Sequence, residues 1–142
     1  MKRLIILIML LLPLSSIAQE ITFTDIMSEY SSKEGCTTMR IGNSLFRSME
    51  IDIDADSMYI ISVENHSLIP RFKAQIETLA TSMEVLMSVN HSSESVNIYQ
   101  LKSDGQIKEI LIVTSEKDVC AAIYIIGTNL VLNQIDSLIN LF

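Results

Sequence analysis

Four strand-like segments follow one another between residues 84 and 126, with only short turns between them. A parallel crossover needs a dozen or more residues, so these strands are expected to form an antiparallel meander. The last of them is apolar on both faces, which predicts a central position in the sheet. The segments begin at about Glu84 and continue as 96–102, 107–114 and 119–126, separated by a polar hairpin loop at 90–95, a tight turn at 103–105 and a turn at 116–118.

Helical spacing of apolar residues recurs in three other segments. Thr22 with Asp25 forms a loose capping box before the first helix, and Gly35 is a candidate stop after it. Pro70 stands where the first turn of the second helix tolerates it. The apolar positions are Phe23, Ile26, Met27 and Tyr30 in the first helix, Ile69, Phe72, Ile76, Leu79, Ala80 and Met83 in the second, and Val131, Ile135, Leu138, Ile139 and Phe142 in a last helix that reaches the C-terminus.

The remaining segments complete an order of α-β-α-β-α-β-β-β-β-α. Strands are expected at 36–41 and 58–63, and a short helix at 44–50 that buries Leu45, Phe46 and Met49, followed by an acidic connector at 51–56. This order predicts a single α+β domain over residues 19–142, with an antiparallel sheet and helices packed mainly on one face. The order of the strands within the sheet stays open.

The N-terminus has the layout of a secretory signal peptide. Lys2 and Arg3 precede an apolar run from Leu4 to Leu14, and Ser16 and Ala18 are small residues at the −3 and −1 positions of a cleavage site. The run is shorter than the roughly twenty apolar residues of a membrane span, and no second candidate follows it. We therefore expect cleavage near Ala18, no transmembrane segment in the mature chain, and an exported protein in the periplasm or cell envelope.

The charge of the chain excludes some classes of partner. The formal net charge of −7 becomes −9 once Lys2 and Arg3 leave with the signal peptide. Such an acidic surface argues against binding nucleic acid or anionic lipid headgroups. The 124 residues that remain of 142 can bury a core large enough to fold without a metal or a disulfide scaffold.

Two cysteines remain in the mature chain, in a compartment that permits disulfides. Cys36 and Cys120 both lie among apolar or β-forming residues, so two buried free thiols are one interpretation. A disulfide that closes the long loop between them is the other. A bridge requires the first and last strands to be neighbours, which the short connections neither demand nor forbid.

Several short motifs, in order along the mature chain, resemble an exported bacterial family known only as domain of unknown function 4252. The resemblance implies an envelope protein of Gram-negative bacteria without an established activity, and it transfers no catalytic residue. It also implies apolar environments for Cys36 and Cys120. The motifs are Tyr30-Ser31-Ser32-Lys33-Glu34-Gly35 with Thr37-Thr38, Ile41 with Leu45-Phe46, Leu86-Met87-Ser88-Val89, Ile107-Lys108-Glu109-Ile110 and Ile126-Gly127.

Two groups of residues invite a metal-site interpretation, and both are incomplete. Asp52, Asp54 and Asp56 alternate as in a calcium loop, but Ser57 stands where that loop needs glycine and Val63 where it needs glutamate. The histidines, His66 and His91, each follow a strand and would need a carboxylate such as Glu64 or Glu94 to complete a zinc site. A solvated acidic turn and two exposed loop histidines are therefore the favoured interpretation.

The sequence contains a short modification-like pattern but no catalytic motif. Ser57 and Ser137 follow an aspartate and precede an apolar residue, a short pattern that resembles an O-glycosylation acceptor of exported bacterial proteins. No nucleophile elbow, phosphate-binding loop, Cys-x-x-Cys or His-Glu-x-x-His motif occurs in the sequence. We therefore predict no catalytic, cofactor-binding or metal-binding residue.

The expected function is that of a non-catalytic module that binds another envelope protein or senses the periplasm. The outer strands of the meander offer edges to which a partner strand could pair. A small-ligand carrier with a pocket between sheet and helices is the first alternative, motivated by the methionines. An enzyme without a recognisable motif is the second, and its first candidates would be the carboxylates of the 51–56 connector and the two histidines.

Overall fold

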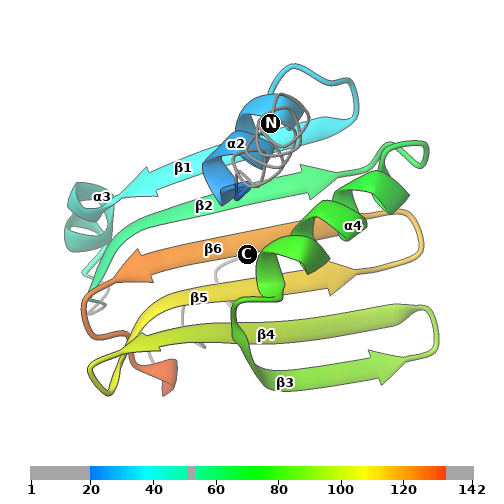
Figure 1. The fold of residues 1–142 in the computed structure, drawn as a ribbon. Coiled ribbons are helices and arrows are strands. Elements are labelled where there is room, and N and C mark those ends of the chain that lie inside the picture. The colour runs from blue at the N-terminus through cyan, green and yellow to red at the C-terminus, as the bar shows by residue number, and fades with distance from the viewer. Residues whose placement is uncertain (1–19, 51–53, 134–142) are drawn as a thin grey trace, which may run out of the picture.

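The computed structural model describes residues 20–50 and 54–133, which contain one six-stranded antiparallel sheet with helices beside it (Figure 1). The segment predicted as a signal peptide, residues 51–53 of the connector and residues 134–142 of the last predicted helix lie outside the described part. The helices are α2 (Phe23–Tyr30), α3 (Asn43–Ser48) and α4 (Ile69–Ala80), and the strands are β1 (Cys36–Gly42), β2 (Ala55–Val63), β3 (Glu84–His91), β4 (Glu94–Ser103), β5 (Gln106–Ser115) and β6 (Cys120–Gly127).

The strands lie in the order β1-β2-β6-β5-β4-β3, and every neighbouring pair is antiparallel. The predicted α+β class and the meander of late strands are thereby confirmed. β6 occupies a central position, as its two apolar faces predict. It pairs with both β5 and β2, so the meander and the two N-terminal strands form one continuous sheet.

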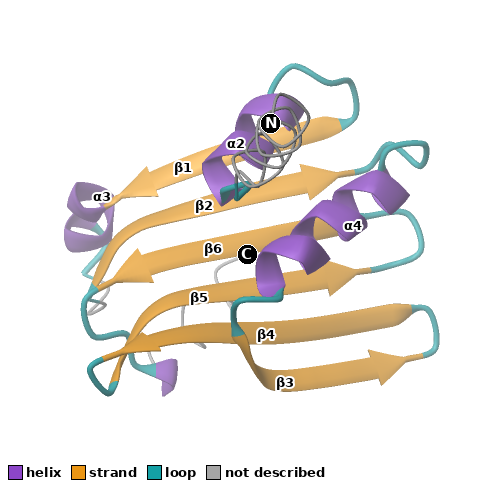
Figure 2. Ribbon diagram, viewed as in Figure 1, coloured by secondary structure: helices purple, strands orange, loops and turns teal. Residues whose placement is uncertain are grey.

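Helices α2 and α4 lie on the same side of the sheet, which we name the front face (Figure 2). Because β2 and β3 run in the same direction but lie four places apart, the connection between them has to cross the sheet, and α4 does so in front of β6 and β5 (Figure 1). The capping box predicted for α2 is present, since Thr22 and Asp25 exchange both hydrogen bonds. Pro70 lies in the first turn of α4.

Both faces of the sheet bury apolar side chains. On the front face, residues of α2 and α4 pack against alternate residues of the central strands. The opposite residues of the same strands form a second cluster on the back face, together with Phe46 of α3 and Leu130. The buried front cluster comprises Phe23, Ile26, Tyr30, Tyr59, Ile61, Val63, Phe72, Ile76, Ala80, Leu111, Cys120 and Ala122, and the back cluster comprises Ile41, Phe46, Ala55, Met58, Ile110, Ile112, Ile125 and Leu130.

A partly buried polar network ties α2 to α4. Tyr30 donates its hydroxyl hydrogen to Gln75 Oε1 at 2.7 Å, and Gln75 Nε2 donates to Glu29 Oε2 at 2.7 Å. Arg71 and Lys33 form ion pairs with Glu29. The hydrogen bond from Gln75 is the main cause that lowers the pKa of Glu29, so this carboxyl stays ionised and fixes the two helices relative to each other.

Several sequence-based expectations were wrong in detail. The short helix α3 ends at Ser48 and buries only Phe46, while Leu45 and Met49 are exposed, because a helix of under two turns presents one narrow face to β1 and β2. The expected loop at 90–95 shrinks to Ser92-Ser93, since the polar residues on either side pair as strand ends. The first helix ends at Tyr30, and Gly35 instead takes a positive φ of 76° in the turn before β1.

Cys36 and Cys120 are free, and the strand order explains why. Val63 of β2 pairs with Cys36 on one side and with Cys120 on the other. Two strand spacings separate their Cα atoms by about 9.5 Å, beyond the roughly 7 Å that a disulfide can bridge. Of the two interpretations, the structure therefore supports free thiols, although only Cys120 is buried and Cys36 is half-buried.

We predict two free thiols when the protein is unfolded without reductant and titrated with a chromogenic disulfide. In the native protein Cys120 should react far more slowly than Cys36, because it is fully buried and burial raises its pKa to about 11. Burial also raises the pKa of the Cys36 thiol, so that residue should itself react more slowly than free cysteine. Thiols that appear only after reduction would contradict this packing.

Gly127 ends β6 at a point where no side chain fits. A Cβ built there would collide with the carbonyl oxygen of Asp54 and would lie 2.6 Å from Leu130 Cδ2. Gly127→Ala should therefore lower the free energy of unfolding by about 2 kcal/mol, as overpacking typically does. Urea denaturation measures the effect, and Gly42→Ala is the matched control because no atom of residues 20–50 and 54–133 lies within 4 Å of its added Cβ. Equal stability of the two variants would contradict the close approach of β6 and residue 54.

Candidate functional site

The acidic connector does not form a cation site in the part that the structure describes. Asp54 and Asp56 are exposed, and Asp56 belongs to strand β2 rather than to a loop, while Asp52 lies outside the described residues. No cluster of three or more histidine, cysteine, aspartate or glutamate side chains comes close enough to hold a metal within residues 20–50 and 54–133.

The two histidines follow strands that are not neighbours. His66 lies beyond the end of β2, and His91 is the last residue of β3. Because β2 and β3 run in the same direction, their C-terminal ends lie on the same side of the sheet. Strands β6, β5 and β4 lie between them, which separates the two ends by about 19 Å at the usual strand spacing. His66 Nε2 instead lies 3.1 Å from Asp118 Oδ1, and both side chains are mainly exposed. A shared site for the two histidines is therefore excluded.

Of the two serines in the glycosylation-like pattern, the structure describes only Ser57. Ser57 is half-buried within β2, paired with Gly42 of β1 and Ile126 of β6. This place inside the sheet disfavours modification of the folded chain. Ser137 lies outside the described residues.

The first candidate site is the free edge of the sheet at β3. Among the described residues β3 pairs only with β4, so its other side presents unpaired backbone N–H and C=O groups over eight residues. Three apolar side chains on this strand are largely exposed: Val85 at 57%, Met87 at 44% and Val89 at 47%. Met87 pairs with Ile98 and Val89 with Val96, so both continue the apolar back face toward the edge.

The opposite edge, β1, is better protected. Helices α2 and α3 both contact it, and it carries the charged Arg40, whose guanidinium lies 5.4 Å from the centre of the Tyr59 ring. Strand β3 contains no lysine, arginine or proline, the residues that most often prevent pairing at a sheet edge. One bulge between Val85 and Met87 interrupts its register, and the five residues beyond it pair regularly with β4.

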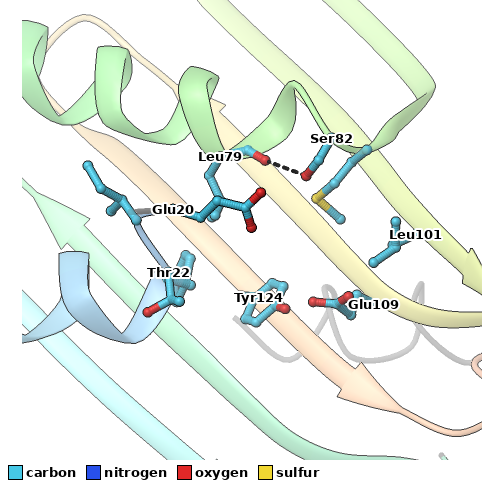
Figure 3. Close-up of a pocket in the computed structure, with 10 residues that line it drawn as sticks. Glu20, Thr22, Leu79, Ser82, Leu101, Glu109 and Tyr124 are labelled. Carbon is cyan, nitrogen blue, oxygen red and sulfur yellow. Dashed lines mark hydrogen bonds between the residues drawn. The ribbon is translucent and has the colours of Figure 1, made fainter. Parts of the chain in front are cut away.

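The second candidate site is a pocket of about 240 Å³ on the front face, between the start of α2 and the end of α4 (Figure 3). Glu109 of β5 and Tyr124 of β6, diagonal neighbours in the sheet, line the pocket from beneath, and Leu79 and Ser82 line its α4 side (Figure 3). The Tyr124 ring stacks on Phe23 of α2, with ring centres 5.0 Å apart. A second hollow of about 200 Å³ adjoins it and shares Glu20, Ile21, Leu79 and Ser82.

Glu109 is the unusual residue of this pocket. It occupies a front-facing position of β5, next to Leu101 on one side and Ile126 on the other. No ion pair among the described residues includes it, and Lys108 beside it donates instead to the Thr128 carbonyl oxygen. Burial raises the pKa of Glu109, which marks a carboxylate held in apolar surroundings without a cation.

No sequence motif marked Glu109 as a site residue. A signal for it is present in the alternation of β5, because Glu109 occupies a position whose next alternate residues are Leu111 of the front cluster and Val113, which packs against that cluster. The alternation of side chains along a strand shows which residues share a face of the sheet. It does not show which face the helices cover. Glu109 therefore emerged only from the packing.

No helix in the described ranges is both long and apolar enough to cross a lipid bilayer. No curated protein and no solved structure matches the chain. A family model described as Domain of unknown function (DUF4252) matches residues 30–138, from the end of α2 past the end of β6, and confirms the resemblance found in the short motifs. The chain belongs to the family of this domain of unknown function.

Proposed function

We propose that this protein is a non-catalytic interaction module of the bacterial cell envelope, which binds an extended segment of a partner protein at the β3 edge. The observation that carries the proposal is the free edge of β3, eight residues long, with Val85, Met87 and Val89 exposed along it. Edge strands of this kind pair with other chains unless charge, proline or a covering element prevents it.

The backbone supplies the binding energy in this proposal. An added strand satisfies the free N–H and C=O groups of β3, over a length of about 27 Å for eight antiparallel residues. Its alternate side chains would lie beside Met87 and Val89 and extend the apolar back face by one strand. Specificity then depends on apolar residues at every second position of the partner.

The charge of the protein indicates the chemistry of the partner. The chain carries 17 acidic and 10 basic residues, and Glu84 and Glu94 lie at opposite ends of the β3–β4 hairpin. A basic partner segment is favoured, whereas a second copy of this acidic chain would bring like charges together. The proposed occupant is therefore a β-branched, lysine- or arginine-containing segment of another protein.

The envelope location rests on the N-terminal sequence. A charged start, a short apolar run and small residues before Gln19 favour export, and the absence of catalytic motifs favours a binding role. Sequencing the N-terminus of the protein recovered from its native cells tests the cleavage near Ala18.

We predict saturable binding of a peptide of about ten residues in which valine and threonine alternate and lysine recurs. Met87→Lys should weaken this binding at least tenfold, because a charged side chain at the edge disfavours pairing. Met39→Lys is the matched control, since Met39 is 45% exposed on the other edge strand and the charge change is the same. Isothermal titration calorimetry measures both affinities.

A second peptide separates strand addition from simple charge attraction. It keeps the lysines but has proline in place of two valines, so it retains the charge and cannot pair as a strand. The proposal predicts no measurable binding of this peptide. Equal affinity for the two peptides, or for the Met87→Lys and Met39→Lys variants, would overturn it. Sedimentation that reveals a dimer abolished by Met87→Lys would instead make a second copy the occupant and refute a heterologous partner.

A further inference from the structure

The pocket around Glu109 takes no part in the strand addition proposed at β3. It lies on the front face, whereas Met87 and Val89 extend the back face. Its lining combines apolar side chains, the ring of Tyr124 and the carboxylates of Glu109 and Glu20. We propose that this pocket binds a small alkylammonium compound, with the ammonium group at Glu109 and the alkyl chain against α4.

Within the described ranges, the carboxylate of Glu109 lacks a charged partner. A half-buried, ionisable group without a charged partner is unfavourable for the folded state, and proteins tend to keep such conflicts where a ligand resolves them. Glu109 is such a group among the described residues, because the ion pairs there form elsewhere and Lys108 is directed to Thr128. An ammonium ion would supply both the missing charge and strong hydrogen-bond donors.

The other walls of the pocket select the rest of the ligand. Tyr124 is held in place by the Phe23 ring and lines the same pocket as Glu109 (Figure 3), and an aromatic ring in the lining favours a cation over a neutral group. Leu79, Met83 and Leu101 provide apolar contact for a short alkyl chain. The volume of about 240 Å³ is below that of most drug-sized sites, so the ligand should be small.

Free alkylamines and lysine side chains both carry an ammonium group on an alkyl chain, and two probes distinguish these two sources. The first is n-butylammonium and the second is N-acetyl-lysine methylamide. Nuclear magnetic resonance titration of the isotope-labelled protein should show saturable shifts at the amides of Glu109, Tyr124 and Ser82. Tighter binding of the butylammonium ion assigns the pocket to a free amine, and tighter binding of the lysine derivative assigns it to a lysine side chain.

Substitution tests whether Glu109 is responsible. Glu109→Gln should weaken butylammonium binding at least tenfold while the resonances elsewhere keep their folded dispersion. Glu116→Gln changes the net charge equally at an exposed turn between β5 and β6, and it should leave the affinity within twofold of the original. n-Butanol, which lacks the charge, should bind at least tenfold more weakly than butylammonium.

Three results would overturn the proposal. They are shifts that do not saturate, shifts spread over the acidic surface rather than gathered at the pocket, and equal affinities in the Glu109→Gln and Glu116→Gln variants. Failure of peptide binding at β3 would leave these measurements unaffected, because Glu109 and Met87 lie on different faces of the sheet.

Discussion

The antiparallel pairing of β2 with β6 is the constraint on which the rest of the structure depends. It joins residues 55–63 to residues 120–127, and so places the meander beside the N-terminal strands in one sheet. Because β6 also pairs with β5, the meander can extend only away from β2, which leaves β3 at the far edge. The connection from β2 to β3 must then cross the front face, and α4 comes to lie beside α2. The free edge and the pocket both result from this one pairing.

Local features of the fold were predictable because their causes are local. Short turns require the meander, the Thr22–Asp25 capping box precedes α2, and Pro70 lies in the first turn of α4. The β2–β6 pairing was not predictable, since it joins segments that are far apart in the sequence and many strand orders fit the same turns. The wrong expectation of buried Leu45 and Met49 has a similar origin, because spacing alone does not reveal how little surface a short helix covers.

The candidate sites were harder to predict than the fold. The sequence drew attention to aspartates, histidines and cysteines, yet the strand order separates His66 from His91 and Cys36 from Cys120. Strand β3 is the outermost strand of the meander, and its alternating side chains leave apolar residues exposed. The hypothesis that an outer strand of the meander accepts a partner strand therefore applies to β3. The position of Glu109 in a pocket depends on α2 and α4, which pack above it. Both sites depend on non-local packing, which no motif records.

Hydrogen exchange of the backbone amides tests the central claim most directly, because it reports which strands are enclosed and which lie at an edge. If β2 pairs with β6 and β3 is a free edge, the amides of β6 should exchange only through global unfolding. Every second amide of β3 should exchange at least about a hundredfold faster, since its hydrogen has no partner in the sheet. Uniformly slow exchange across β3, or fast exchange in β6, would contradict the strand order and with it the proposed edge.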